Sequence, residues 1–215
     1  MKRCIIITGF ITGNPKKLLK IKKNDFIICA DRGYEYAKAS KIKPNILIGD
    51  FDSLREDLPD DISIIHYPSE KNDTDTMLCL KYALEHDFDE LILIGGIGGR
   101  IDHTIANIQS MAYTVDNWKG NDRYQKRISM IDDRNCIFLL KNSSITLTGH
   151  EGQILSIASF TNESKKVTTS GLHWNLKEAT LTNTFPLGVS NYFSQNKVTV
   201  SVGDGTLLVI LSQDF

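Results

Sequence analysis

The sequence predicts an α/β protein in which an N-terminal domain with an open parallel sheet precedes a C-terminal all-β sandwich domain. Up to about residue 132, short and almost wholly apolar segments alternate with helical patterns, which is typical of a parallel sheet covered by helices on both faces. From about residue 136, short segments rich in β-branched residues follow one another without a helical period, which is typical of a sandwich. We therefore expect domains at residues 1–134 and 135–215.

Six strands are expected in the first domain because six short runs are nearly all apolar. They are residues 4–8, 26–30, 45–49, 62–67, 91–95 and 128–131. Two helices are expected between them, from apolar residues at helical spacing. These residues are Met77, Leu80 and Leu84 in the first helix, and Ile105, Ile108 and either Met111 or Ala112 in the second. We interpret the polar stretch 116–127 as a surface excursion before the last of these strands.

The second domain is expected to consist of short strands separated by turns. The strands are residues 144–148, 153–160, 165–170, 179–184, 197–202 and 206–211. The Asp204–Gly205 pair before the last of them is typical of a tight hairpin.

The composition argues against two classes of partner. The formal net charge of −1 provides no basic field to attract nucleic acid. No apolar run approaches the roughly 18 residues of a membrane span. Thr8 and Gly9 interrupt the first apolar run, so we interpret it as a strand and not as a signal peptide. The four cysteines form no CxxC pair, and we expect reduced thiols and a cytoplasmic protein.

Dense polar or glycine-rich segments follow four of the predicted strands. They are "ADRG" (30–33), "GDFDS" (49–53), "PSEKNDTD" (68–75) and "GGIGGRIDH" (95–103). Because the carboxyl ends of parallel strands share one edge of the sheet, where open α/β folds bind ligands, the four segments predict one site.

Carboxylates are the first chemical feature of this site. Asp50 and Asp52 project to the same side if the chain stays extended, and two carboxylates suit Mg²⁺; the alternative is a solvated turn. Asp73 or Thr74 can cap the following helix. Since capping needs only one such residue, we favour a functional role for Asp75.

Phosphate-binding groups are the second feature. The four glycines among residues 95–99 allow close backbone approach, and the helix start after them offers free N–H groups. Neither GxGxxG nor a P-loop occurs. Arg100 can form a bidentate phosphate contact, Lys71 either reaches a phosphate or is solvated, and Asp102 is either an ordinary N-cap or part of the site. His103 is expected to be structural.

The acids together point to a metal-bound nucleotide. They are Asp31, Asp50, Asp52, Asp75 and Asp102. Two like charges 4 Å apart repel by about 4 kcal/mol at an effective dielectric constant near 20. A bare triphosphate would therefore be repelled unless Mg²⁺ lay between the carboxylates and the phosphates, so we expect Mg²⁺ together with ATP.

These motifs in this order, with "GLHWNL" and "GVSN" further on, resemble the thiamine pyrophosphokinase family. The resemblance implies a homodimer with sites shared between subunits, which transfers pyrophosphate from Mg-ATP to thiamine and releases AMP. It implies catalytic and metal-binding roles for Asp50, Asp52 and Asp75. The family's nucleotide-binding acids fall on Asp31 and Asp102. From the residues themselves we also expect nucleotide binding by Arg32, Lys71, Asp73, Gly96, Gly98, Gly99 and Arg100. The resemblance also implies thiamine binding by Trp174, Ser190 and Asn191.

Three points stay open at this stage. Arg32 stands where the family usually has glycine, which leaves the local loop shape undecided. Trp174 can stack on a cationic ring or can be a core residue of the sandwich. The alternative functions are a Mg²⁺-dependent phosphatase that uses "DFD" as its nucleophile motif, and a non-catalytic thiamine or nucleotide sensor.

Overall fold

The structure, a computed structural model, describes residues 1–55, 57–118 and 127–213. The chain divides into two compact units, Met1–Asp133 and Arg134–Phe215. The first unit contains, in chain order, β1 (Arg3–Ile7), α1 (Pro15–Leu18), β2 (Phe26–Ala30), α2 (Gly33–Ala39), β3 (Ile46–Gly49), β4 (Ser63–His66), α3 (Asp75–Leu84), β5 (Glu90–Ile94), α4 (Ile101–Asn117) and β6 (Arg127–Ile131). No helix among the described residues is long and apolar enough to cross a membrane.

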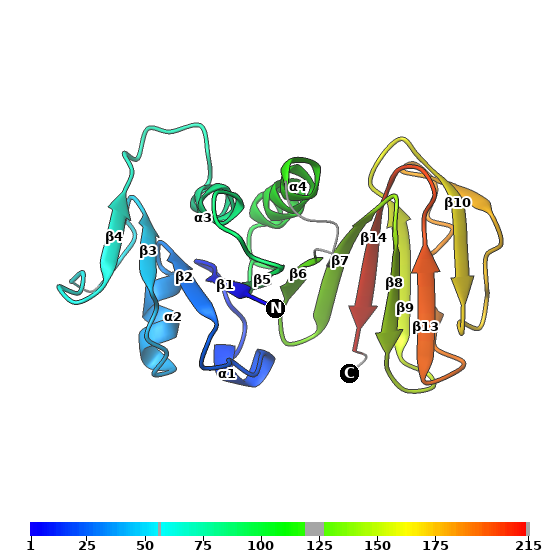
Figure 1. The fold of residues 1–215 in the computed structure, drawn as a ribbon, viewed down its shortest axis with the longest axis horizontal. Helices are drawn as coiled ribbons and strands as arrows, with labels where there is room; N and C mark the ends of the chain where they lie inside the picture. The colour runs from blue at the N-terminus through cyan, green and yellow to red at the C-terminus, as the bar shows by residue number, and fades with distance from the viewer. Residues whose placement is uncertain (56, 119–126, 214–215) are drawn as a thin grey trace. The chain divides into compact units, whose positions relative to one another are not determined.

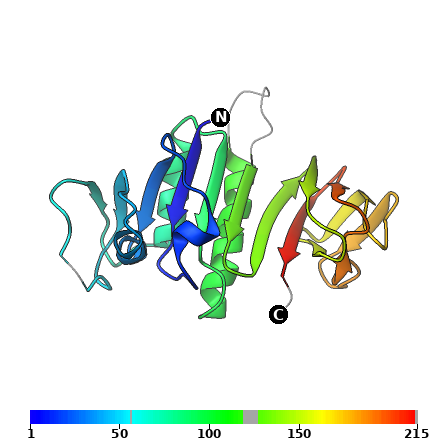
Figure 2. The same ribbon diagram turned by 90° about the horizontal axis from the view of Figure 1, so that it is seen from below.

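The strands of the first unit form a parallel sheet in the order β6-β5-β1-β2-β3-β4. α3 and α4 cover one face and α1 and α2 cover the other (Figure 1). Seen from below, α1 and α2 lie in front of the strands (Figure 2). This double cover explains why every residue of β1 is buried. The predicted α/β class is confirmed, and the six predicted strands agree with the structure to within one residue at each end.

The order of the strands reverses between β1 and β5. Strands β2, β3 and β4 lie on one side of β1, whereas β5 and β6 lie on its other side. Open α/β sheets bind ligands at the carboxyl ends of the strands beside such a reversal. The chain segments that follow β1 and β5 are joined there by backbone hydrogen bonds. Thr8 N donates to Ile94 O at 3.1 Å, and Gly96 N donates to Phe10 O at 2.8 Å.

The buried face of α4 is largely polar, so the apolar face predicted for this helix is only partly right: Met111 is fully buried, as predicted. The buried residues of the helix are Thr104, Asn107, Ser110, Met111 and Thr114. Ile105, expected on the buried face, is 52% exposed. Two of the buried hydroxyls are satisfied within the helix, because Ser110 Oγ donates to Ala106 O and Thr114 Oγ1 donates to Ser110 O. The third, Thr104 Oγ1, accepts a hydrogen bond from Gly98 N in the preceding loop at 3.0 Å. Most of the predicted excursion at 116–127 falls on residues 119–126, which lie outside the described residues.

The second unit is built from antiparallel strands. They are β7 (Asn135–Lys141), β8 (Ser144–Thr148), β9 (Ile154–Ser159), β10 (Glu163–Ser170), β11 (Ala179–Thr182), β12 (Asn191–Tyr192), β13 (Lys197–Ser201) and β14 (Thr206–Ser212). One sheet has the order β12-β9-β14-β7 and the other has the order β11-β10-β13-β8. Buried and exposed residues alternate along β8 and β9, as in a sandwich whose inner faces form the core. β7 and β12 were not among the predicted strands.

The predicted hairpin at Asp204–Gly205 is wrong. β13 pairs with β8 and β10, whereas β14 pairs with β7 and β9. The turn therefore carries the chain from one sheet to the other. Gly205 has φ +106°, and Asp204 O accepts a hydrogen bond from Lys165 N at 2.7 Å.

Candidate functional site

A cavity of about 530 Å³ lies at the carboxyl ends of the parallel strands. Its walls come from the segments after β1, β2, β3 and β5, from the segment between β4 and α3, and from α4. The predicted site residues in its lining are Asp31, Arg32, Asp50, Lys71, Asp73, Asp75, Gly96, Gly98 and Arg100. Of the predicted residues in the described part of the first unit, Asp52, Gly99 and Asp102 lie outside the lining.

Asp31 enters the cavity from a strained turn after β2. Its backbone is left-handed, with φ +45°. Gly49 permits this turn, since a Cβ there would lie 3.1 Å from the Asp31 Cα. The Ser53 hydroxyl donates to Asp31 Oδ2, while the buried Oδ1 accepts no hydrogen bond. A buried carboxylate oxygen without a donor is costly, which is typical of a position that meets a ligand or a cation.

Asp50 and Asp52 are held by a turn and not by an extended strand. Phe51 has φ +58°, so the alternation that placed both acids on one side does not apply, and that reasoning was wrong. The two acids still interact, because the Asp52 amide donates to Asp50 Oδ1 at 3.4 Å. The Asp50 carboxylate raises the pKa of Asp52. The Lys71 ammonium, by its hydrogen bond, lowers the pKa of Asp50.

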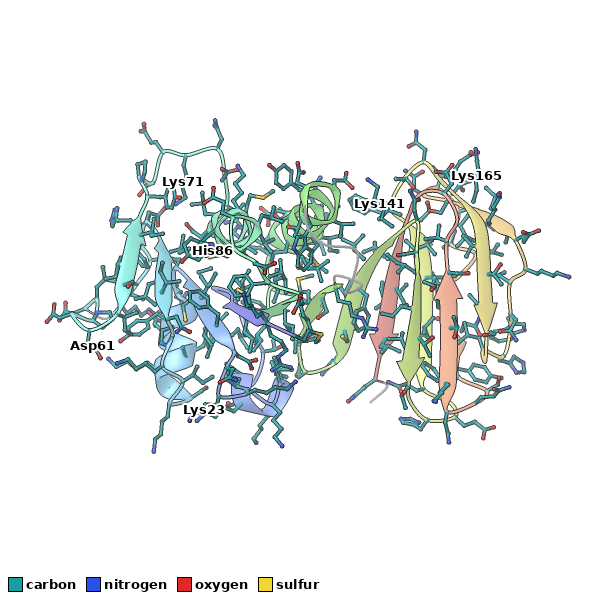
Figure 3. The ribbon with its side chains drawn as sticks, viewed as in Figure 1. Lys23, Asp61, Lys71, His86, Lys141 and Lys165 are labelled. Atoms are coloured by element: carbon teal, nitrogen blue, oxygen red, sulfur yellow. The ribbon has the colours of Figure 1, made fainter. Side chains whose placement is uncertain are left out.

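Lys71 places a fixed positive charge inside the cavity. It lies on the loop between β4 and α3 (Figure 3), and its side chain is only 12% exposed. Its Nζ lies 2.6 Å from Asp50 Oδ2 and 2.9 Å from Asp75 Oδ1. Burial alone would lower the pKa of Lys71, but the hydrogen bonds to these carboxylates outweigh it and the pKa is raised. Of the two interpretations of Lys71, the merely solvated side chain is therefore wrong.

The start of α3 leaves Asp75 free for chemistry. Thr74 is the N-cap, and its Oγ1 accepts a hydrogen bond of 3.2 Å from an amide of the first turn. Asp73 is engaged by Lys81, whose Nζ lies 2.6 Å from Asp73 Oδ2. Burial raises the pKa of Asp75 although the hydrogen bond from Lys71 opposes the rise. A carboxyl group with a raised pKa in a cavity is typical of a proton acceptor.

The glycine loop, residues 95–99, has a backbone that side chains would obstruct. The φ angles of its four glycines lie between +64° and +87°. A Cβ at Gly96 would lie 2.7 Å from Asn107 Nδ2, and a Cβ at Gly95 would lie 2.3 Å from Phe10 O. The loop leads into α4, whose first N–H groups have no partner within the helix and can face phosphate oxygens.

Two arginines line the cavity in different ways. Arg100 is at the N-cap position of α4, so Asp102 is not the N-cap. Instead Asp102 Oδ2 lies 2.6 Å from Arg100 Nη2, and both side chains are mostly exposed. Arg32 has an ordinary helical φ of −58°, which settles the loop shape that its replacement of a family glycine left open. Its Nη2 lies 3.4 Å from Glu35, and its buried Nε has no hydrogen-bond partner.

Trp174 lies on the surface of the second unit, with 59% of its area exposed. The interpretation of Trp174 as a core residue is therefore wrong. Its indole meets the rings of His173 and Tyr192 edge-on, with centroid distances of 4.5 and 5.5 Å. Asn191 fixes its backbone, since Oδ1 accepts from Trp174 N at 3.2 Å and Nδ2 donates to Trp174 O at 2.7 Å. Ser190 is exposed and has φ +60°.

The donors in the cavity fit Mg²⁺ that arrives with a nucleotide. In the described part of the chain, no group of three or more His, Cys, Asp or Glu side chains is arranged to hold a metal ion. Mg²⁺ typically uses only one or two carboxylates, together with waters and substrate phosphates. Asp31 Oδ1 is a buried oxygen that accepts no hydrogen bond from the described residues, and Asp75 Oδ1 is a buried oxygen paired with the Lys71 ammonium. Such oxygens are the ligands that Mg²⁺ prefers.

Ser53, Asn107 and Phe10 are among the cavity residues that sequence reasoning did not assign to the site. Ser53, which holds Asp31, follows the second aspartate of "GDFDS", and its hydroxyl was a readable signal. Asn107 supports the glycine loop by donating from Nδ2 to Gly96 O at 2.9 Å. Its only signal is a polar residue on a buried helix face. Phe10 lines the cavity after β1, and nothing in its local sequence marks it.

Two family patterns match the chain. The pattern described as "Thiamin pyrophosphokinase, catalytic domain" matches residues 18–119. The pattern described as "Thiamin pyrophosphokinase, vitamin B1 binding domain" matches residues 142–207. The first match covers the segments after β2, β3, β4 and β5, and the second covers Trp174, Ser190 and Asn191.

Known proteins of this family are similar over the whole length. The chain is 28% identical over 217 residues to the thiamine pyrophosphokinase of Bacillus subtilis, covering 96% of this chain and 98% of that one. It is 26% identical over 188 residues to thiamine pyrophosphokinase 1 of Arabidopsis thaliana, covering 80% and 67%. A crystal structure of the Bacillus subtilis enzyme has a TM-score of 0.83 at 25% identity, with full coverage of both chains. The chain belongs to the thiamin pyrophosphokinase family.

Proposed function

We propose that the chain transfers the pyrophosphoryl group of Mg-ATP to the hydroxyl of thiamine, giving thiamine diphosphate and AMP. Membership of the family makes the chain a thiamine pyrophosphokinase, an enzyme of the diphosphotransferase class. The observation that carries the detailed proposal is the cavity in which the acidic side chains meet the glycine loop. Family membership does not favour the phosphatase or the sensor.

Asp50, Asp52 and Asp75 would hold Mg²⁺, and the ion would neutralise the charge between these carboxylates and the phosphates. Lys71 already lies among the carboxylates, and its ammonium group would bind a phosphate oxygen of the nucleotide. The amides at the start of α4 and Arg100 would orient the remaining phosphate oxygens. Positioning and charge stabilisation of this kind supply most of the acceleration in phosphoryl transfer.

The thiamine hydroxyl would attack the β-phosphorus of ATP in line with the departing AMP. The hydroxyl proton has to be accepted by a base. Asp75 is our candidate, because its carboxylate lines the cavity beside Lys71 and Asp50. The attack forms the new P–O bond as the bond to AMP breaks, and the negative charge leaves on AMP.

The second unit would bind thiamine. The exposed indole of Trp174 can stack on the cationic rings, with a cation–π attraction of about 0.5–2 kcal/mol. Ser190 and Asn191 would hydrogen-bond the aminopyrimidine, although part of the Asn191 amide is already engaged by Trp174. We propose further that the enzyme is a cytoplasmic homodimer, in which the thiamine surface of one subunit serves the acidic cavity of its partner.

The direct test is to incubate the purified protein with Mg-ATP and thiamine and to measure both products. AMP and thiamine diphosphate are expected in equal amounts. The variants Asp52→Asn and Asp75→Asn should lower turnover by about 100-fold or more, because each removes a charge that acts on the reacting phosphates, while unfolding stays cooperative. Asp61→Asn is the matched control, since Asp61 is a surface acid paired with Lys43. Near-normal turnover in either site variant would contradict its role.

A further inference from the structure

Phe10 presents an aromatic ring to the cavity at the reversal of strand order. It follows β1 by three positions, and it is 39% exposed although it belongs to the cavity lining. An aromatic ring that is left partly open inside a polar cavity is unusual for a residue that only fills the core. The exposed part of Phe10 is therefore available to contact a ligand in the cavity.

The backbone of Phe10 is held firmly in place. Its carbonyl oxygen accepts hydrogen bonds from Gly96 N at 2.8 Å and from the Thr8 hydroxyl at 3.2 Å. The same Thr8 hydroxyl also donates to Ile94 O at the end of β5, at 3.0 Å. The Phe10 backbone is thus fixed between the segments after β1 and β5.

One side of the ring rests on the glycine loop. A Cβ at Gly99 would lie 2.9 Å from a Phe10 ring carbon, and a Cβ at Gly98 would lie 3.6 Å away. The absence of side chains at these glycines therefore makes room for the ring as well as for phosphates. Phe10 nevertheless stays 39% exposed and belongs to the cavity lining, so a flat ligand in the cavity can reach it.

The acids of the cavity and Lys71 follow strands on one side of β1, the strand that Phe10 follows. Asp31 follows β2 and Asp50 follows β3, while Lys71 and Asp75 come after β4. The strand order β5-β1-β2-β3-β4 places β1, which Phe10 follows, two strand spacings from β3 and three from β4, about 10 and 14 Å. A nucleotide whose terminal phosphates meet the acids and Lys71, and whose phosphate nearest the base meets the start of α4, would therefore have its base on the Phe10 side of the cavity.

We propose that the Phe10 ring is the stacking surface for the purine base of the nucleotide. The proposal rests on the proposed function only for the identity of the ligand as ATP. It adds to that function a residue that contributes to affinity through the base and that makes no contact with the phosphates. A purine presents two fused rings to the phenyl face and is favoured over a smaller pyrimidine.

The test compares ATP with inorganic tripolyphosphate, which has the phosphates without the base. Binding of each in the presence of Mg²⁺, without thiamine, is measured by calorimetry for the wild type and for Phe10→Ala. Phe10→Ala should weaken ATP binding by about tenfold, the size of one base–aromatic contact, and should leave tripolyphosphate binding unchanged. Tyr113→Ala is the control, because Tyr113 is exposed to a similar extent, 41%, outside the cavity lining.

Phe10→Trp provides a second readout that does not depend on tripolyphosphate affinity. It should keep ATP affinity within a factor of about two, and ATP should quench the added indole fluorescence relative to the wild type. The proposal is overturned by equal weakening of both ligands in Phe10→Ala, by no weakening of ATP binding, or by no quenching in Phe10→Trp. Binding of ATP without any formation of thiamine diphosphate would instead refute the proposed function and leave the Phe10 result to stand by itself.

Discussion

The side chain of Asn191 holds the backbone of Trp174 by hydrogen bonds. Three hydrogen bonds use the amide: Oδ1 accepts from Trp174 N and Tyr192 N, and Nδ2 donates to Trp174 O. A side chain that satisfies both backbone groups of an exposed residue fixes that residue on the surface. The sequence resemblance indicates only that Asn191 belongs to the thiamine site, whereas the geometry indicates how it can act there.

Asn191→Ala should therefore raise KM for thiamine by about tenfold and leave KM for ATP unchanged. Without Asn191 the indole of Trp174 is mobile, and fixing it when thiamine binds costs free energy. Steady-state kinetics for each substrate, with the emission wavelength of the tryptophans, would measure this. Asn183→Ala is the control, because the side-chain amide of Asn183 is exposed and its Nδ2 lies 3.5 Å from Asn162 Oδ1. An unchanged KM for thiamine in Asn191→Ala would contradict the positioning role.

At the scale of single elements, the glycine loop allows a prediction with an internal control. Gly96 and Gly152 have nearly the same left-handed φ, +80° and +82°. A Cβ at Gly152 would meet nothing within 4 Å, whereas a Cβ at Gly96 would meet Asn107 Nδ2 at 2.7 Å. Both alanine variants bear the backbone strain of about 1–2 kcal/mol, and only Gly96→Ala adds a clash.

Gly96→Ala should consequently be less stable than Gly152→Ala, by about 1–3 kcal/mol of unfolding free energy. It should also bind ATP more weakly, because the clash displaces the loop that precedes α4. Urea unfolding and nucleotide titration of the two variants would measure both effects. Equal stability of the two variants would show that Asn107 moves aside without cost.

The first strand is tied to the loop before β2 by a buried ion pair. Arg3 Nη2 lies 2.6 Å from Asp25 Oδ2, and the two side chains are 9% and 2% exposed. Burial alone would raise the pKa of Asp25, but the hydrogen bonds from Arg3 and from the Lys22 amide outweigh it, and the pKa lies below its ordinary value of 3.8. The folded state thus binds the Asp25 proton less readily than the unfolded state does.

The free energy that this pair contributes is present above pH 3.8 and is lost as the pH falls through the lowered pKa of Asp25. Asp25→Asn should cost about 3 kcal/mol of unfolding free energy near neutral pH, because it leaves the buried Arg3 with the more distant carboxylate of Glu90, whose Oε2 lies 4.0 Å from Arg3 Nε. The difference from the wild type should shrink at acidic pH. The exposed pair of Lys43 and Asp61 is the control, and Asp61→Asn should cost less than about 1 kcal/mol. A difference that does not change with pH would contradict the ion-pair explanation.

The parallel strands were predictable because double burial leaves a plain apolar signature in the sequence. α4 was only partly predictable, since Thr104 and Thr114 are buried through hydrogen bonds that a hydropathy pattern does not register. The Asp204–Gly205 turn was misread for a related reason. Its local sequence is typical of a hairpin, but β13 and β14 pair with strands that are distant in the sequence and not with each other.

The candidate site was predictable as a set of residues and less so as geometry. The position of the acids after strands follows from parallel topology. The left-handed Phe51 and the double ion pair of Lys71 depend on contacts with segments far away in the chain. Phe10 could not be found at all, because its role depends on β5 lying beside β1, and that neighbourhood is a property of the folded sheet.

At the scale of the whole molecule, the proposal of shared sites makes a quantitative prediction. Asp75→Asn and Trp174→Ala should each be nearly inactive alone. When the two variants are refolded together, random pairing should restore about a quarter of wild-type activity, since half of the dimers are mixed and each has one intact site. If each site is instead completed within a single chain, the mixture should stay inactive. The yield of mixed dimers, measured with two affinity tags, is the control.

Removal of divalent ions should separate activity from stability. A chelator should abolish turnover, and added Mg²⁺ should restore it. The melting temperature without nucleotide should change by no more than about 2 °C, because the Lys71 ammonium already offsets the charges of Asp50 and Asp75. A large drop in melting temperature on chelation would show that the cation, and not Lys71, holds the acids together.

The lysine between the two acids also bears on how such an enzyme is made. A newly synthesised chain that had to gather several bare carboxylates would fold against their mutual repulsion until a metal arrived. With an ammonium from the same chain already among them, the pocket can assemble during synthesis in a magnesium-poor environment. If the enzyme uses Mg²⁺ as proposed, supply of the ion would then govern how fast the finished enzyme works, and would not govern how much of the enzyme reaches its native state.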